Sequence, residues 1–224
     1  MIDIKEIFDN DEIVKSVGLW LPGDGDSTEL AGAAEYAAEM GVDAMSVVQQ
    51  HVSIVWPWVE RLKLKIMSRF YVDSVGLDAM SALAVDIKSV FKQGADGAQV
   101  IVKLNELTRF ADLIASVRDD LFFQKNLTIG LDIFEVWPLD WDVVFGALNK
   151  IHASSLLLIL THDDHEKSDF TGRIYGALSA WNADSNMELH VMLDESFGRA
   201  EQVYRLVAKM RPELLDKLYF WISY

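Results

Sequence analysis

The chain has 224 residues, of which 51% are hydrophobic and 25% are charged, with 35 acidic residues against 20 lysines and arginines. This composition is enough to bury a sizeable core, which excludes disordered and fibrous classes. A formal net charge of −15 repels phosphate backbones and anionic lipid surfaces, so we expect no nucleic-acid partner and no membrane partner. The absence of cysteine excludes disulfide frameworks, thiolate nucleophiles and cysteine-ligated metal centres.

Residues 1–10 lack the apolar core of a signal peptide, and no apolar run approaches the roughly 20 residues that a membrane helix requires. We therefore expect a cytoplasmic protein. Length and composition together predict a single domain over residues 1–224.

Short apolar runs alternate with longer amphipathic runs along the chain. The apolar runs that predict strands are 17–22, 43–49, 64–71, 98–104, 127–134, 155–161, 188–194 and 218–223. The runs with helical spacing between them are 27–40, 52–62, 75–92, 106–121, 140–151, 168–182 and 197–210. Capping residues are expected at helix starts, as at Ser27.

Strands this apolar must be covered on both faces, so the alternation predicts a parallel sheet enclosed by helices. Eight such strands predict a compact α/β fold, the (βα)8 TIM barrel. An open doubly wound sheet is the alternative. Residues 22–27 contain a G-x-G but not the third glycine of a dinucleotide-binding turn, which favours the barrel.

The last predicted strand ends at the end of the sequence, so the barrel is expected to have no eighth C-terminal helix. Residues 4–16 carry apolar positions at helical spacing and predict an N-terminal helical extension (1–16) over the open flank. The alternative is a homodimer through the uncovered eighth strand, in which Leu218, Phe220 and Ile222 contact a second subunit.

Polar residues inside or just after the predicted strands are the candidate site, because barrel chemistry lies where strands end. The members within strands are Arg69, Tyr71, Lys103, Asp132 and Asp194, and those that follow strands are Gln50, Asn105 and Ser196. A charge buried in the barrel is costly unless it is paired, so these groups either neutralise one another or meet a ligand.

Of these candidates, Lys103 indicates a specific reaction most clearly. Held in an apolar barrel beside Arg69, a lysine would have a lowered pKa and could attack a carbonyl to form a Schiff base. Asp132 or Asp194 would then act as general acid and base. Arg69, Tyr71, Gln50, Asn105 and Ser196 would bind and orient the small-molecule substrate.

The stretch Gln99-Val-Ile-Val-Lys103-Leu-Asn-Glu-Leu-Thr108 is similar to the fourth-strand pattern of the transaldolase family of class I aldolases. Leu193-Asp-Glu-Ser-Phe197-Gly-Arg-Ala resembles that family's seventh-strand turn. The resemblance implies a TIM-barrel lyase in carbohydrate metabolism, with Lys103 as the Schiff-base lysine and no cofactor. Two of the family's motifs are absent. Residues 17–22 replace its first-strand acid, and residues 46–50 replace its Thr-Thr-Asn-Pro-Ser motif.

Two other functions stay open. The segment His162-Asp163-Asp164-His165 follows the sixth strand, so Asp132, His162 and Asp194, with His51 in addition, could hold one divalent metal ion. That site would make the protein a metal-dependent sugar isomerase, epimerase or hydrolase. The third possibility is a barrel that binds a ligand or partner without catalysis.

Three further residues are expected to be structural. His190 lies low in the seventh strand and is predicted to be a core histidine with satisfied hydrogen bonds. Trp20 and Trp221, on the first and last strands, are predicted to fill the barrel interior.

Overall fold

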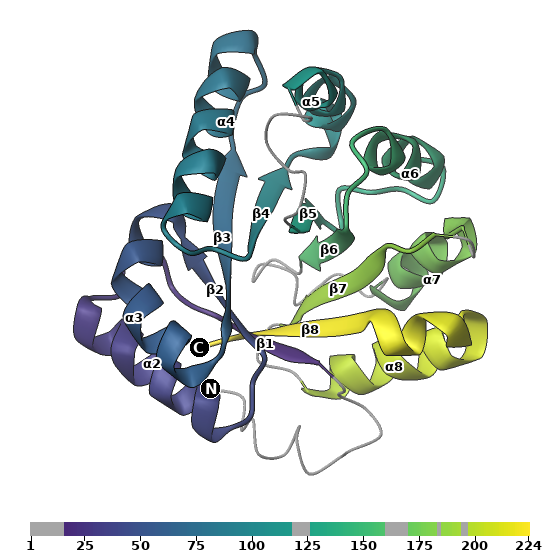
Figure 1. The fold of residues 1–224 in the computed structure, drawn as a ribbon. Coiled ribbons are helices and arrows are strands. Elements are labelled where there is room, and N and C mark those ends of the chain that lie inside the picture. The colour runs from purple at the N-terminus through teal and green to yellow at the C-terminus, as the bar shows by residue number, and fades with distance from the viewer. Residues whose placement is uncertain (1–15, 118–125, 160–169, 183–184, 194–196) are drawn as a thin grey trace.

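Eight parallel strands close into a barrel in consecutive order, with β8 hydrogen-bonded to β1, as the alternation of strands and helices predicted (Figure 1). The computed structural model describes residues 16–117, 126–159, 170–182, 185–193 and 197–224. The expected N-terminal helix over residues 4–16 lies, apart from its last residue, outside the described residues.

The strands match their predicted ranges to within two residues at each end. They are β1 (Val17–Trp20), β2 (Ala44–Val48), β3 (Lys65–Val72), β4 (Gly97–Val102), β5 (Asn126–Asp132), β6 (Ser155–Ile159), β7 (Glu188–Leu193) and β8 (Leu218–Ser223). The agreement follows from the apolar, β-rich composition of each run. One difference affects the site: β4 ends at Val102, one residue before Lys103.

Seven α-helices of the described chain connect the strands and lie around the barrel (Figure 1). They are α2 (Ser27–Glu39), α3 (Val52–Leu62), α4 (Leu77–Lys92), α5 (Leu104–Val117), α6 (Trp141–Lys150), α7 (Phe170–Ala180) and α8 (Phe197–Met210). The expected cap at Ser27 is wrong by one residue. Asp26 caps α2, because its carboxylate accepts from the backbone of Thr28 and Glu29 while the Glu29 side chain accepts from the Asp26 backbone.

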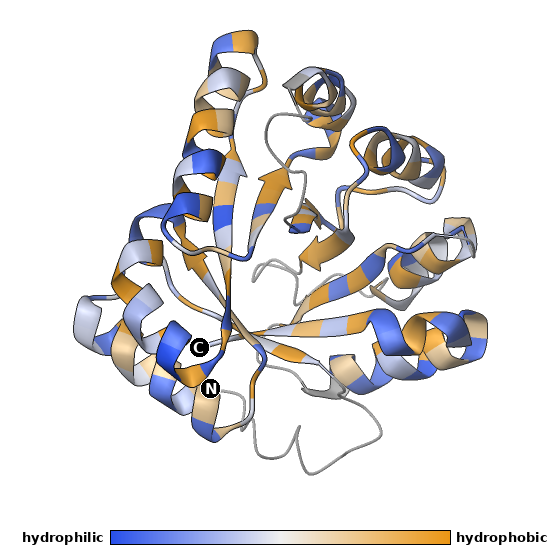
Figure 2. Ribbon diagram, in the orientation of Figure 1, coloured by the Kyte–Doolittle hydropathy of each residue, from blue (hydrophilic) through white to orange (hydrophobic). Residues whose placement is uncertain are grey.

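The hydrophobic residues form two layers, and Figure 2 shows hydrophobic residues on the strands with polar residues between them. The larger layer packs between the strands and the helices. The smaller layer lies inside the barrel and contains Trp20, Ala44, Met67, Leu157 and Trp221. Gly18 makes room for this layer, because a Cβ at that position would lie 2.4 Å from Cζ3 of Trp221.

The outward face of β8 is buried, which corrects the expectation of an uncovered eighth strand. Leu218, Phe220 and Ile222 are 4%, 1% and 0% exposed within the single chain. The sequence-based argument for a homodimer through this strand therefore loses its physical basis. None of the described helices has the length and apolarity that crossing a bilayer demands.

Candidate functional site

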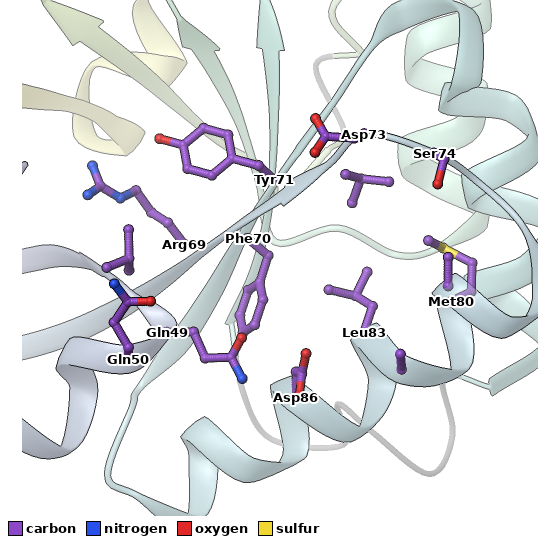
Figure 3. Close-up of a pocket in the computed structure, with 14 residues that line it drawn as sticks. Gln49, Gln50, Arg69, Phe70, Tyr71, Asp73, Ser74, Met80, Leu83 and Asp86 are labelled. Carbon is purple, nitrogen blue, oxygen red and sulfur yellow. The ribbon is translucent and has the colours of Figure 1, made fainter. Parts of the chain in front are cut away.

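Several polar side chains lie around Arg69 of β3. A cavity of about 500 Å³ opens beside the carboxyl end of β3, next to α4. Its polar lining includes Gln49, Gln50, Arg69, Tyr71 and Asp73, and its apolar lining includes Phe70 of β3 with Met80 and Leu83 of α4. Figure 3 shows Arg69 and Tyr71 extending to one side of β3 while Phe70 extends to the other. This arrangement follows from the two-residue period of a strand.

Arg69 is a buried cation with few partners. It is 3% exposed, and its guanidinium carbon lies 4.2 Å from the ring centroid of Trp20. Nη2 donates to the carbonyl of Leu21, whereas Nε and Nη1 have no hydrogen-bond partner among the described residues. Burial lowers the pKa of Arg69 to about 10, so the group stays charged at neutral pH.

Gln99 of β4 lies beside Arg69, because the two residues pair across the β3–β4 ladder. Its Oε1 accepts from the hydroxyl of Ser46, 2.5 Å away, and both side chains are 0% exposed. Nε2 of Gln99 has no hydrogen-bond partner among the described residues. The amide therefore adds a second set of buried, unpaired donors next to Arg69.

His51 adjoins this cluster at the start of α3. Its side chain is buried, and Nδ1 has no hydrogen-bond partner within the described part of the chain. Burial, and then the charge of Arg69, lower the pKa of His51, while Asp24 acts in the opposite direction. The structure thus brings His51 near Arg69.

Lys103 differs from its expected position. It lies exposed in the turn between β4 and α5 and is not held within an apolar barrel, so the predicted burial is wrong. Its backbone is nevertheless well fixed. The carbonyl of Lys103 accepts from Glu106 N at 3.0 Å, and the next amide, Leu104 N, donates to Oε2 of Glu135 at 3.1 Å.

Asp132 ends β5, the strand next to β4. Ile101 pairs with Gly130, and Lys103 and Asp132 each follow two residues later. Both therefore stand at the same edge of the barrel. Oδ1 of Asp132 accepts from Phe134 N at 2.8 Å, which fixes the carboxylate at the strand end.

The other predicted site residues fall into two groups. Gln50 and Tyr71 line the cavity, and Tyr71 is 57% exposed. Asn105 is exposed in the first turn of α5. Asp194, Ser196 and His162 lie outside the described residues.

Of the four residues proposed as metal ligands, Asp132 and His51 are among the described residues, and His51 lies near Arg69. No group of three or more histidine, aspartate or glutamate side chains suited to a metal ion occurs in the described part of the chain. The proposed ligands His162 and Asp194 are not among the residues searched.

His190 has the satisfied hydrogen bonds that the sequence predicted. Its Nε2 lies 3.0 Å from Oε2 of Glu188, and its Nδ1 accepts from Nε1 of Trp221 at 3.2 Å. The hydrogen bond with His190 lowers the pKa of Glu188. Trp221 also packs against Trp20, with ring centroids 6.3 Å apart, so the two tryptophans fill the interior as predicted.

Gln99 and Ser46 were not among the predicted site residues. The signal that could have identified Gln99 is an amide in the middle of an otherwise apolar strand, Gly97–Val102. Ser46 is a similar polar interruption of β2. The sequence does not reveal that Ser46 and Gln99 contact each other, because 53 positions separate them.

Comparisons with solved structures return many barrels of the same architecture. A proposed deoxyribose-phosphate aldolase from Toxoplasma gondii ME49, in its apo form, is 14% identical, with a TM-score of 0.78 over 98% of this chain and 93% of that chain. The tetrameric deoxyribose phosphate aldolase from Aeropyrum pernix is 10% identical, with a TM-score of 0.70 over 96% and 91%. The chain shares their barrel fold.

The fold likeness extends beyond aldolases. Orotidine 5′-phosphate decarboxylase from Pyrococcus horikoshii OT3 is 11% identical, with a TM-score of 0.62 over 92% of this chain and 88% of that chain. No protein-family model matches the sequence, and no curated protein matches it significantly. At these identities the resemblance establishes the architecture, and the chemistry must be argued from the residues.

Proposed function

We propose that the protein is an aldolase-type lyase that acts on a small carbonyl compound, with Lys103 as the amine nucleophile. The observation that carries this proposal is the position of Lys103. It is a lysine at the carboxyl end of a barrel strand, with its backbone held on both sides and Asp132 at the same edge. The aldolases among the structural neighbours make such chemistry a natural use of the fold.

In this proposal the unprotonated amine of Lys103 adds to the substrate carbonyl, and the carbinolamine loses water to give an iminium. Asp132 takes the proton of the hydroxyl group on the carbon next but one to the iminium. The carbon–carbon bond then breaks, its electrons pass into the iminium to give an enamine, and an aldehyde leaves. Protonation of the enamine and hydrolysis return the lysine.

Lys103 is exposed, so a substrate can reach its amine from solvent. Glu135 acts as a positioning residue in this scheme, because it holds the amide that follows Lys103. We expect Glu135→Ala to slow trapping of Lys103 several-fold without changing which lysine reacts.

The test is reductive trapping. The purified protein is incubated with a panel of small aldehydes, ketones and oxo acids in the presence of borohydride, and the modified peptide is identified by mass spectrometry. We expect one adduct per chain on Lys103, and no adduct in Lys103→Met.

The matched control is Lys92→Arg, which alters an exposed lysine in the last turn of α4 and should leave trapping unchanged. Equal labelling of several surface lysines, or unchanged labelling in Lys103→Met, would refute the role of Lys103.

A further inference from the structure

The buried donors around Arg69 require an explanation that the lysine chemistry does not supply. Arg69 carries unpaired N–H groups on Nε and Nη1, and Gln99 carries an unpaired amide nitrogen, within the described chain. Both side chains are more than nine-tenths buried. Burying a donor without an acceptor costs about 1–3 kcal/mol, and more when the donor is charged.

The unpaired atoms of Arg69 and Gln99 are all donors, so a ligand that satisfies them must present acceptors. The guanidinium remains charged near neutral pH, because its pKa is about 10. The Trp20 ring covers the guanidinium, and the oxygen of Gln99 accepts from the Ser46 hydroxyl. Arg69 is also among the residues that line the 500 Å³ cavity between β3 and α4, although its guanidinium extends away from α4 (Figure 3).

We infer that Arg69 and Gln99 form a carboxylate-binding subsite in the barrel, and that the substrate of the proposed lysine chemistry is a small oxo acid. The inference that the substrate is an oxo acid rests on the proposed function. A carboxylate matches the planar fork of a guanidinium, which can donate two parallel hydrogen bonds to it. The Gln99 amide supplies a further donor on the neighbouring strand.

The charge balance favours a carboxylate over a phosphate. Arg69 is the cation that the described residues place in this cluster, so a carboxylate monoanion would be compensated more fully than a phosphate dianion. Along β4, Gln99 pairs with Arg69, and Lys103 lies exposed just past the end of the same strand.

Acetate tests the subsite independently of the lysine, because it has a carboxylate and no carbonyl. We would titrate the full chain with acetate, pyruvate and inorganic phosphate and follow the Arg69 Nε–H signal by nitrogen-15 NMR. We expect saturable acetate binding that shifts this signal and phosphate binding at least tenfold weaker. Lys103→Met should bind acetate as the unmodified protein does, even though it cannot trap pyruvate.

Two variants make the assignment specific. Gln99→Glu places a carboxylate beside Arg69 within the protein, so acetate affinity should fall at least a hundredfold while the melting temperature rises. Arg69→Lys keeps a charge but loses the fork, and should weaken acetate at least tenfold. Arg61→Gln, at an exposed arginine that contacts Glu35, is the control and should not change binding.

Unchanged acetate affinity in Gln99→Glu would overturn the subsite, as would tighter binding of phosphate than of acetate. Absence of any saturable shift would mean that water or a rotated Gln99 amide satisfies Arg69, and the inference would fail. If acetate binds but pyruvate is never trapped at Lys103, the subsite stands and the lysine mechanism falls.

Discussion

Arg69 and His190 lie inside the same barrel in opposite chemical situations. His190 is 6% exposed and has an acid on one ring nitrogen and an indole N–H on the other. Arg69 is 3% exposed, and it has one carbonyl acceptor and the face of Trp20, with two nitrogens unpaired among the described residues. A side chain whose partners are all internal serves the fold, whereas one left with spare donors is suited to a ligand.

Two neighbours sharpen this contrast. Thr128 and Ser155 pair with each other at 2.6 Å between β5 and β6, so that side of the barrel satisfies its own hydroxyls. The Tyr219 hydroxyl beside His190 is an exception, because it is buried without a partner in the described chain. It is neutral, since burial raises its pKa, and a neutral group costs less to leave unpaired than a guanidinium.

The largest expected effect on stability is at His190, whose ring nitrogens both have hydrogen-bond partners. His190→Leu removes the acceptor of the Trp221 indole N–H and leaves that donor buried and unpaired. We expect the free energy of unfolding to fall by about 2–4 kcal/mol, measured by urea denaturation. A loss below about 1 kcal/mol would show that these hydrogen bonds do not hold the interior together.

The second prediction concerns the space that Trp221 needs to reach His190. In Gly18→Ala the new Cβ would lie 2.4 Å from the Trp221 ring, so the ring or the strand must move. We expect a loss of about 1–3 kcal/mol in the free energy of unfolding. Gly32→Ala on α2 is the control, because its Cβ would meet no atom within 4 Å and should stabilise the helix by up to about 1 kcal/mol.

The third prediction concerns Arg69, which has unpaired nitrogens among the described residues. Arg69→Met removes the buried charge together with its bond to Leu21 and fills much of the same volume. We expect the free energy of unfolding to stay unchanged or to rise by up to about 2 kcal/mol, because buried ionic groups often cost more in desolvation than they return. A loss larger than about 1 kcal/mol would place Arg69 with His190 as a structural residue.

The smallest effect is a pH dependence. Glu188 has a lowered pKa, mainly through its hydrogen bond with His190, so its contribution to stability is present above the unfolded-state value of about 4.3. That contribution is lost as the pH falls through the folded-state pKa. Its side chain is 53% exposed, so we expect less than about 1 kcal/mol.

Urea denaturation at pH 6 and at pH 3.5 measures this contribution. The difference in stability between the two pH values should be smaller in Glu188→Gln than in the unmodified protein. Equal differences would mean that the Glu188–His190 contact is not formed in solution.

Much of the fold could be predicted, because each strand and helix carries its own local pattern. The ranges of β2, α3 and β8 follow directly from apolar alternation and helical spacing. The site was predicted only in part. Arg69 was identified as a polar interruption of an apolar strand, but the exposure of Lys103 depended on β4 ending two residues before its predicted end.

The sequence by itself determined the barrel, the inward direction of Arg69 and the interior position of Trp221, since these depend on periods of two and 3.6 residues. Only the tertiary structure decided which buried polar groups have partners. Ser46 reaches Gln99 across 53 positions and Trp221 reaches His190 across 31, and the register between strands brings them together. That register leaves two nitrogens of Arg69 without an acceptor among the described residues. No local sequence pattern predicts this, because it depends on residues that are distant along the chain.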